Sequence, residues 1–163
     1  MNIRRLESSD DRMAVSHIYE ESWKYAYKDL LPQEYLDGIQ KGHWSGKLDE
    51  KGLATLLLMD GGKYAGVCGF CQSRFPQFEG CGEIVSIYLL PEYMGKGHGK
   101  ALFEEAVIQL KKQGFSKIFL WVLEGNERAI RFYEKAGFVK GEPFLQDNIG
   151  GKDVREISYW RRL

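Results

Sequence analysis

The sequence predicts a mixed α/β fold, in which one mostly antiparallel sheet carries helices on both faces. Three patterns favour this fold: short apolar runs bounded by glycine or proline, two hairpin signals, and an alternation of strand and helix in the C-terminal half. From these patterns we expect roughly six to seven strands and about four helices. Residues 1–163 form a single predicted domain, because no linker, repeat or shift in composition interrupts them.

The N-terminal part of the chain predicts one strand and two helices. The strand is expected at 2–7, and Asp10 or Asp11 can cap the helix that follows it. Pro32 breaks that helix and fits the first turn of a second one, which is expected to end at Gly42.

Three apolar runs in the middle of the chain predict strands. Runs 53–59 and 64–74 flank Asp60-Gly61-Gly62, whose glycines supply the positive φ that a tight hairpin requires. The third run, 82–90, stops at Pro91 and predicts a central strand.

The C-terminal half alternates strand and helix before a final hairpin. Its predicted elements are a helix that follows glycines 95–99 and ends at Gln113-Gly114, a strand at 117–123, a helix from Asn126 to Gly137, and hairpin strands at 138–145 and 154–160. Each of the two helices presents one apolar stripe, so we expect both to pack on the sheet.

Charge and apolar patterning exclude several classes of protein. Lys+Arg and Asp+Glu both number 23, which gives a formal net charge of zero and no basic field for nucleic acid. No apolar run approaches the roughly 20 residues that cross a bilayer, and residues 1–8 do not resemble a signal peptide. We therefore expect a cytoplasmic protein without a nucleic-acid or membrane partner.

The three cysteines are expected to remain reduced in such a compartment. Cys68 and Cys71 have the spacing of a C-x-x-C pair, but no second pair or nearby histidine completes four zinc ligands. No metal site is therefore predicted.

The most informative segment is the glycine cluster 95–99, which lies between a strand and a helix. Glycines allow several backbone N–H groups to converge, and the start of a helix favours a phosphate or pyrophosphate. Lys96 and Lys100 can add positive charge. A ligand-free turn is the alternative. A P-loop is excluded because Ala101 follows Gly99-Lys100, and the glycine spacing does not fit a dinucleotide fingerprint.

Two motifs resemble the GNAT superfamily of N-acetyltransferases. Met94-Gly95-Lys96-Gly97-His98-Gly99 is similar to the superfamily's Gln/Arg-x-x-Gly-x-Gly/Ala loop, which binds the pyrophosphate of acetyl-CoA. The segment from Asn126 to Phe138 resembles its Asn-x-x-Ala-x-x-Phe-Tyr-x-x-x-Gly-Phe helix. The order of elements extends the resemblance over nearly the whole chain, although the first 60 residues match only as a variable helical part. Met94 departs from the usual Gln or Arg, and a modest effect on affinity is expected because the loop acts through its backbone.

The resemblance implies the GNAT fold and a metal-independent N-acetyltransferase that uses acetyl-CoA. The backbone of Ile87, Tyr88 and Leu89 is implied to pair with the pantetheine arm, and the N–H near Leu89 to polarise the thioester carbonyl. The implied pyrophosphate contacts are Met94, Gly95, Lys96, Gly97, His98, Gly99 and Lys100. Asn126 is implied to touch the cofactor arm, although capping the helix is an independent role for it.

Tyr133 is the implied acid that protonates the leaving thiolate. It lies seven residues after Asn126, so both side chains face the same side of the helix. A phenol with a pKa near 10 is a workable donor to a thiolate, although a core aromatic is the alternative.

Glu83 is the candidate base for the acceptor amine, with a water path as the other route. Its spacing before Met94 is similar to that of the catalytic glutamate in the histone-acetylating branch of the superfamily. A strand-end glutamate can equally be paired with a cation. The bacterial N-terminal-alanine acetyltransferases place their base on the following strand, where Trp121 stands here.

Trp23 and Tyr27 are candidate acceptor-binding residues together with Glu83, because aromatics mixed with carboxylates can hold a cationic amine. The alternative is that these aromatics form the apolar face of a helix.

The expected partner is a small-molecule or peptide amine, and a homodimer is among the options for assembly. A non-catalytic acyl-CoA-binding sensor or interaction module is the alternative hypothesis about function, and a nucleotide-binding protein is a third hypothesis.

Overall fold

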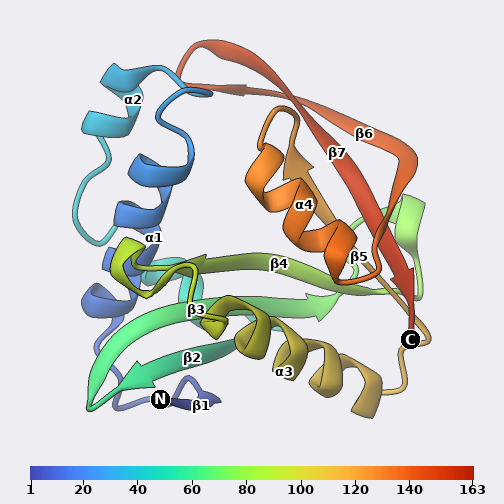
Figure 1. Cartoon of the computed structure of the whole chain (residues 1–163), viewed down its shortest axis with the longest axis horizontal. Helices are drawn as coiled ribbons and strands as arrows, with labels where there is room; N and C mark the ends of the chain where they lie inside the picture. The colour runs from blue at the N-terminus through green and yellow to red at the C-terminus, as the bar shows by residue number, and fades with distance from the viewer.

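The computed structural model describes all 163 residues, which form a seven-stranded sheet with helices on both faces (Figure 1). The strands are β1 (Asn2–Arg5), β2 (Ala54–Asp60), β3 (Lys63–Gln72), β4 (Gly82–Leu89), β5 (Lys117–Leu123), β6 (Val139–Ile149) and β7 (Lys152–Arg162). The helices are α1 (Arg12–Ala26), α2 (Gln33–Asp37), α3 (His98–Lys112) and α4 (Glu127–Lys135), with short 3-10 turns between some elements. None of them is both long and apolar enough to cross a membrane.

The sheet is mixed and mostly antiparallel, as predicted. Its order is β1-β2-β3-β4-β5-β7-β6, so β4 is the central strand. The pair of β4 and β5 is parallel, and every other neighbouring pair is antiparallel. The last strand, β7, is inserted between β5 and β6.

Alternation along the strands divides the core between the two faces. In β2, Leu56 and Leu58 belong to the cluster that holds the buried side chains of α3 and Tyr133 of α4. Leu57, between them, packs with Val15 and Ile18 of α1 on the other face. Because successive side chains point to opposite faces of a strand, one short apolar run supports helices on both sides.

Most predicted caps and turns are confirmed. Asp11 caps α1 by accepting hydrogen bonds from the N–H groups of Met13 and Ala14. The turn between β2 and β3 has positive φ at both central glycines, 53° at Gly61 and 87° at Gly62. This combination is typical of the two-residue turns that match the twist of a hairpin.

Several boundaries differ from the prediction. Helix α2 begins after Pro32, which is its N-cap, and ends at Gly38 instead of Gly42. Gly42 lies in the following loop, where its N–H donates to the buried carboxylate of Glu20 at 2.7 Å. The C-terminal hairpin strands are longer than predicted, because Gly150 and Gly151 alone make the turn.

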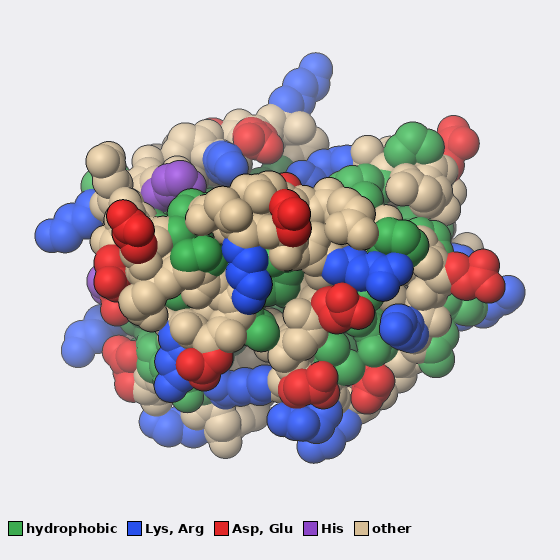
Figure 2. Space-filling model, turned by 90° about the horizontal axis from the view of Figure 1, so that it is seen from above, with side chains coloured by type: hydrophobic (Ala, Val, Ile, Leu, Met, Phe, Trp, Pro, Cys, Tyr) green, Lys and Arg blue, Asp and Glu red, His purple; other side chains and the backbone are tan.

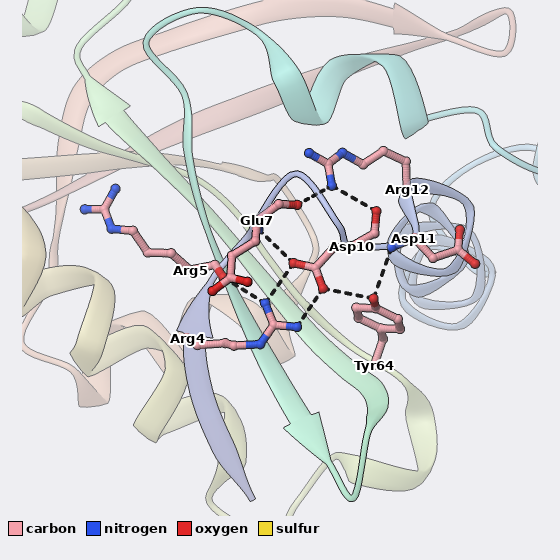
Figure 3. Close-up of polar contacts among 7 residues, drawn as sticks. All are labelled: Arg4, Arg5, Glu7, Asp10, Asp11, Arg12 and Tyr64. Carbon is pink, nitrogen blue, oxygen red and sulfur yellow. Dashed lines mark hydrogen bonds and ion pairs between the residues drawn. The ribbon is translucent and has the colours of Figure 1, made fainter.

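A polar cluster attaches the first strand to the start of α1 (Figure 3). Arg4 forms a bidentate ion pair with Asp10, with N···O distances of 2.6 and 2.7 Å. Asp10 also accepts hydrogen bonds from the Tyr64 hydroxyl at 2.9 Å and from the Glu7 N–H at 2.7 Å. The hydrogen bonds from Arg4 hold the pKa of Asp10 well below its usual range.

The contact between β4 and β5 is short, and this positions the site. Only Gly82 with Ile118 and Glu83 with Phe119 are paired across it. A bulge in β4 opposite Gly69 and Phe70 interrupts the other ladder nearby. Beyond these pairs β4 runs away from β5 (Figure 1), because a bulge bends its strand.

The surface carries charges of both signs. Acidic and basic side chains are interspersed over the face seen in Figure 2, in keeping with the equal numbers of the two kinds in the sequence.

Candidate functional site

A cavity of about 720 Å³ opens where β4 and β5 separate. Its volume is typical of small-molecule sites. Thirteen of the residues predicted to bind or react line it: Trp23, Tyr27, Glu83, Ile87, Tyr88, Leu89, Met94, Gly95, Gly97, Gly99, Lys100, Asn126 and Tyr133. Lys96 and His98 do not line it, and the Lys96 ammonium donates instead to the Glu92 carbonyl at 2.8 Å.

The edge of β4 that faces the cavity has free backbone groups. Neighbouring residues in an antiparallel ladder alternate between bonding to the partner strand and pointing away from it. The Leu90 N–H donates to the Ala65 carbonyl at 3.0 Å, so Ile87 and Leu89 turn their N–H groups to the opposite edge. The Leu89 carbonyl on that edge accepts a hydrogen bond from the buried Ser22 hydroxyl at 2.7 Å.

The glycine loop forms the start of α3. Gly95 and Gly97 have φ values of 75° and 82°, which favour glycine, and a Cβ at either position would meet open space. Gly97 is the N-cap of α3, and no side chain caps the helix. The N–H groups of its first turn are therefore available to an anion, which the helix dipole also favours.

Positive side chains border this loop. The Arg128 guanidinium, from the start of α4, lies 3.1 Å from the Met94 sulfur. A cation thus stands beside the position where Met94 replaces the usual Gln or Arg. Lys100, Arg131 and Lys135 also line the cavity.

Asn126 and Tyr133 reach the cavity from the two ends of α4. The Asn126 side chain accepts a hydrogen bond from the Ala129 N–H at 3.3 Å, so its capping role is confirmed. Its amide nitrogen has no partner within the chain. Tyr133 is 9% exposed and packs beside Phe103 and Phe132. Burial raises the pKa of the Tyr133 phenol well above its usual range, and the nearby Tyr88 adds to this shift.

Three tyrosines lie across the middle of the cavity. The hydroxyls of Tyr27 and Tyr88 are 3.2 Å apart, within hydrogen-bonding distance. Burial is the main cause that raises the pKa of Tyr27 to about 12, and the hydrogen bond with Tyr88 opposes it. Trp23 packs edge-on against Tyr27, with the ring centroids 4.9 Å apart.

Glu83 is buried and paired. It is 1% exposed, and Arg74 donates to its two oxygens from Nη2 at 2.7 Å and from Nε at 3.1 Å. The Arg74 backbone N–H at 3.1 Å and the Cys71 thiol at 3.9 Å complete the set. Three of these donors reach Oε2, and one, Nη2 of Arg74, reaches Oε1.

The sequence analysis missed Arg74 and Glu156, which both line the cavity. Arg74 lies two residues after the end of β3 and contacts Glu83 from there. Glu156 lies opposite Leu123 of β5 and Leu145 of β6, a position that depends on the insertion of β7 between those strands. The only signal in the sequence was a carboxylate within an otherwise alternating strand pattern.

A backbone edge without a partner strand, next to a helix start that can hold phosphate, suits a long ligand with an amide-rich arm and a phosphate group. Transfer of an acyl group from such a carrier is the class of reaction that this fold and cavity define. The chain belongs to the acetyltransferase (GNAT) family, whose family model matches residues 12–138. The family and the fold predicted from the sequence are therefore confirmed.

Named relatives of the chain are N-acetyltransferases. The spermidine N(1)-acetyltransferase of Thermoplasma acidophilum is 28% identical over 98% of this chain and 98% of its own length. The uncharacterized N-acetyltransferase YuaI of Bacillus subtilis is 28% identical over 91% of this chain and 86% of its own length.

Solved structures share the fold at lower identity. The PaiA N-acetyltransferase from Thermoplasma acidophilum in complex with coenzyme A has a TM-score of 0.76 and 22% identity, and each chain is covered fully, at 100%. The ribosomal-protein-S18-alanine N-acetyltransferase from Escherichia coli has a TM-score of 0.73 and 20% identity, with 99% of this chain and 92% of that chain covered.

Proposed function

We propose that this protein transfers the acetyl group of acetyl-CoA to a primary amine of a small molecule or peptide, by direct attack within a ternary complex. The observation that carries the proposal is the free edge of β4 at Ile87 and Leu89, which faces the cavity between the start of α3 and Tyr133. The likeness to a spermidine acetyltransferase over the whole length supports a small amine as the acceptor.

The residues present suit acetyl-CoA as the co-substrate. The first turn of α3 and the backbone of residues 94–100 would hold the pyrophosphate, and Arg128 would supply the charge beside Met94. The Ile87 N–H and carbonyl would hydrogen-bond the pantetheine amides as a neighbouring strand does. The Asn126 amide nitrogen would add a contact from α4. Lys96 and His98 would contribute their backbone alone.

The reaction then needs an oxyanion donor and an acid. The Leu89 N–H would donate to the thioester oxygen, an interaction generally worth about 3 kcal/mol of transition-state stabilisation. Ser22 holds the next peptide group in place through the Leu89 carbonyl. Tyr133 would protonate the leaving thiolate, and the raised pKa keeps its phenol protonated at neutral pH. Glu83 or a water path would take the proton of the acceptor.

Calorimetric titration with acetyl-CoA tests the proposal, with ATP and NADH as controls. Selective binding of acetyl-CoA, followed by release of free thiol when amines are added, is the expected result. Binding without transfer to any amine, unchanged by Tyr133→Phe, would favour the non-catalytic acyl-CoA-binding module. Preference for ATP would overturn both. The three free, buried cysteines suit the reducing cytoplasm, where such a reaction is expected to take place.

A further inference from the structure

The acceptor side of the cavity contains a carboxylate that the reaction described above does not use. Glu156, on β7, lines the cavity. Val154, two residues earlier and therefore on the same face of the strand, packs against the cluster of Leu31, Leu36 and Leu123, which Trp23 of α1 also contacts. Glu156 thus faces the side of the sheet that α1 covers, opposite the face on which α3 and Tyr133 pack.

No positive group neutralises Glu156. The one charge that affects its pKa is that of Asp147, on β6, which is also negative and secondary to burial. Arg74, which lines the same cavity, is bound to Glu83, and no ion pair joins Glu156 to any cation of the chain. A partly buried carboxylate without a cation is costly unless a ligand supplies one.

The walls around Glu156 suit a cation. Trp23, Tyr27, Phe75 and Trp121 all line this part of the cavity. Aromatic faces attract ammonium groups, more strongly where water is excluded. One free carboxylate among aromatic rings is an arrangement that selects a positively charged amine over a neutral molecule of the same shape.

We propose that Glu156 receives the ammonium group of the acceptor and takes its proton before the attack. This inference rests on the proposed acetyl transfer and names the acceptor as a cationic aliphatic amine.

The protons balance as follows. The ammonium loses one proton to the Glu156 carboxylate, and the free amine attacks the thioester carbon. The C–S bond breaks as the carbonyl re-forms, and the thiolate takes a proton from Tyr133. Tyr133 regains a proton from the nitrogen of the intermediate, which leaves a neutral amide. Glu156 releases its proton to solvent, so that acetyl-CoA and the ammonium give the amide, CoA and one proton.

The electrostatic surroundings suit this role. Burial, and secondly the charge of Asp147, raise the pKa of Glu156 above its usual value, which makes it a better proton acceptor than an exposed glutamate. Asp147 of β6 and the apolar Leu123 of β5 lie on the same face of the sheet as Glu156, and Tyr27, the residue after α1, lines the same cavity.

Binding of a cation and of its neutral analogue tests the ammonium site without any turnover. The full-length protein saturated with coenzyme A is titrated with n-pentylamine and with 1-pentanol at pH 7. We expect the amine to bind about tenfold more tightly. In Glu156→Gln this preference should fall to about twofold or less, whereas Glu142→Gln, an exposed carboxylate of β6, should retain it. An unchanged preference in Glu156→Gln would overturn the site.

Steady-state kinetics test the proton transfer. With an amine that the wild type acetylates, Glu156→Gln should lower kcat on the order of 100-fold and remove the acidic limb of the pH profile. A kcat equal to that of the wild type would overturn the proton-accepting role. If no amine is acetylated, the proposed function fails, and the binding titration still decides whether Glu156 holds an ammonium group. Thermal unfolding of each variant checks that it is folded.

Discussion

The hydroxyl of Tyr27 on α1 lies 3.2 Å from the hydroxyl of Tyr88 on β4, inside the cavity where the sheet divides. Burial raises the pKa of both phenols, so neither ionises near neutral pH. The hydrogen bond fixes the first helix against the strand that we propose aligns the thioester. The acceptor and co-substrate sides of the cavity are thus joined by uncharged groups.

Tyr133→Phe is expected to lower kcat about 100-fold and to leave the affinity for acetyl-CoA unchanged, because the phenol would act on the leaving group. Burial raises the pKa of Tyr133, so the acid form persists with rising pH, and this group should cause no loss of activity below about pH 10. Stopped-flow or steady-state thiol release measures both effects. Tyr159→Phe, a buried tyrosine that donates to Glu134 at 3.2 Å, is the matched control. Full turnover by Tyr133→Phe would contradict the acid role.

Gly97→Ala should weaken acetyl-CoA binding about tenfold, or 1.4 kcal/mol. The new Cβ would project into the open space at the start of α3, at a φ of 82° that L-residues avoid. Gly114→Ala, at the other end of the same helix with a φ of 94°, imposes the same backbone strain away from the cavity. Calorimetry should find normal affinity for that control. Equal affinity in the two variants would argue against a phosphate at this helix start.

Glu83→Gln should reduce stability more than it changes the pH profile. The substitution removes a buried charge that receives four donors, at a cost of about 1–3 kcal/mol in the free energy of unfolding. Urea denaturation measures this loss, and kcat against pH is recorded for the same protein. Loss of the acidic limb in Glu83→Gln, with that limb intact in Glu156→Gln, would instead make Glu83 the base.

Asp10→Asn should destabilise the protein by about 1–3 kcal/mol at pH 7, since Asp10 accepts two hydrogen bonds from Arg4. The folded-state pKa of Asp10 lies below its unfolded value, so its contribution is complete above about pH 4 to 5 and declines as pH falls further. The difference in urea midpoint between the wild type and Asp10→Asn should become smaller as the pH is lowered from 7 to 2. Glu7→Gln removes a neighbouring charge outside the pair and should have little effect. The same difference in midpoint at every pH would contradict the role assigned to the Asp10 carboxylate.

The sequence was sufficient to place the glycine loop and α4 at the cavity, because both depend on local patterns. The glycine loop, the helix that it starts, and the spacing from Asn126 to Tyr133 each lie within one turn or one helix. Even there, Lys96 and His98 were placed in the site by motif alone, and their side chains do not line the cavity. A pattern that acts through the backbone carries no information about where such side chains point.

The residues that line the acceptor side were predicted only in part, because Glu156 and Arg74 are brought there by sheet register and by contacts between strands. Glu156 faces the cavity only because β7 lies between β5 and β6, an order that neither periodicity nor turn residues reveal. Arg74 lies outside any recognised motif, yet its guanidinium donates hydrogen bonds to both oxygens of Glu83. Such contacts depend on which strands become neighbours in the sheet. Local sequence patterns predict single helices and strands and do not give the order of the strands.

The short pairing between β4 and β5 has a consequence for how the molecule unfolds. Two pairs of residues are all that connect the strands β1 to β4 with the strands β5 to β7 through backbone hydrogen bonding. Apolar side chains, most of them in the cluster that α3 and α4 share, provide the other contacts between the two parts. A ligand lying along Ile87 and Leu89 would act as an additional strand between two half-sheets, so its binding would couple their melting into a more cooperative transition.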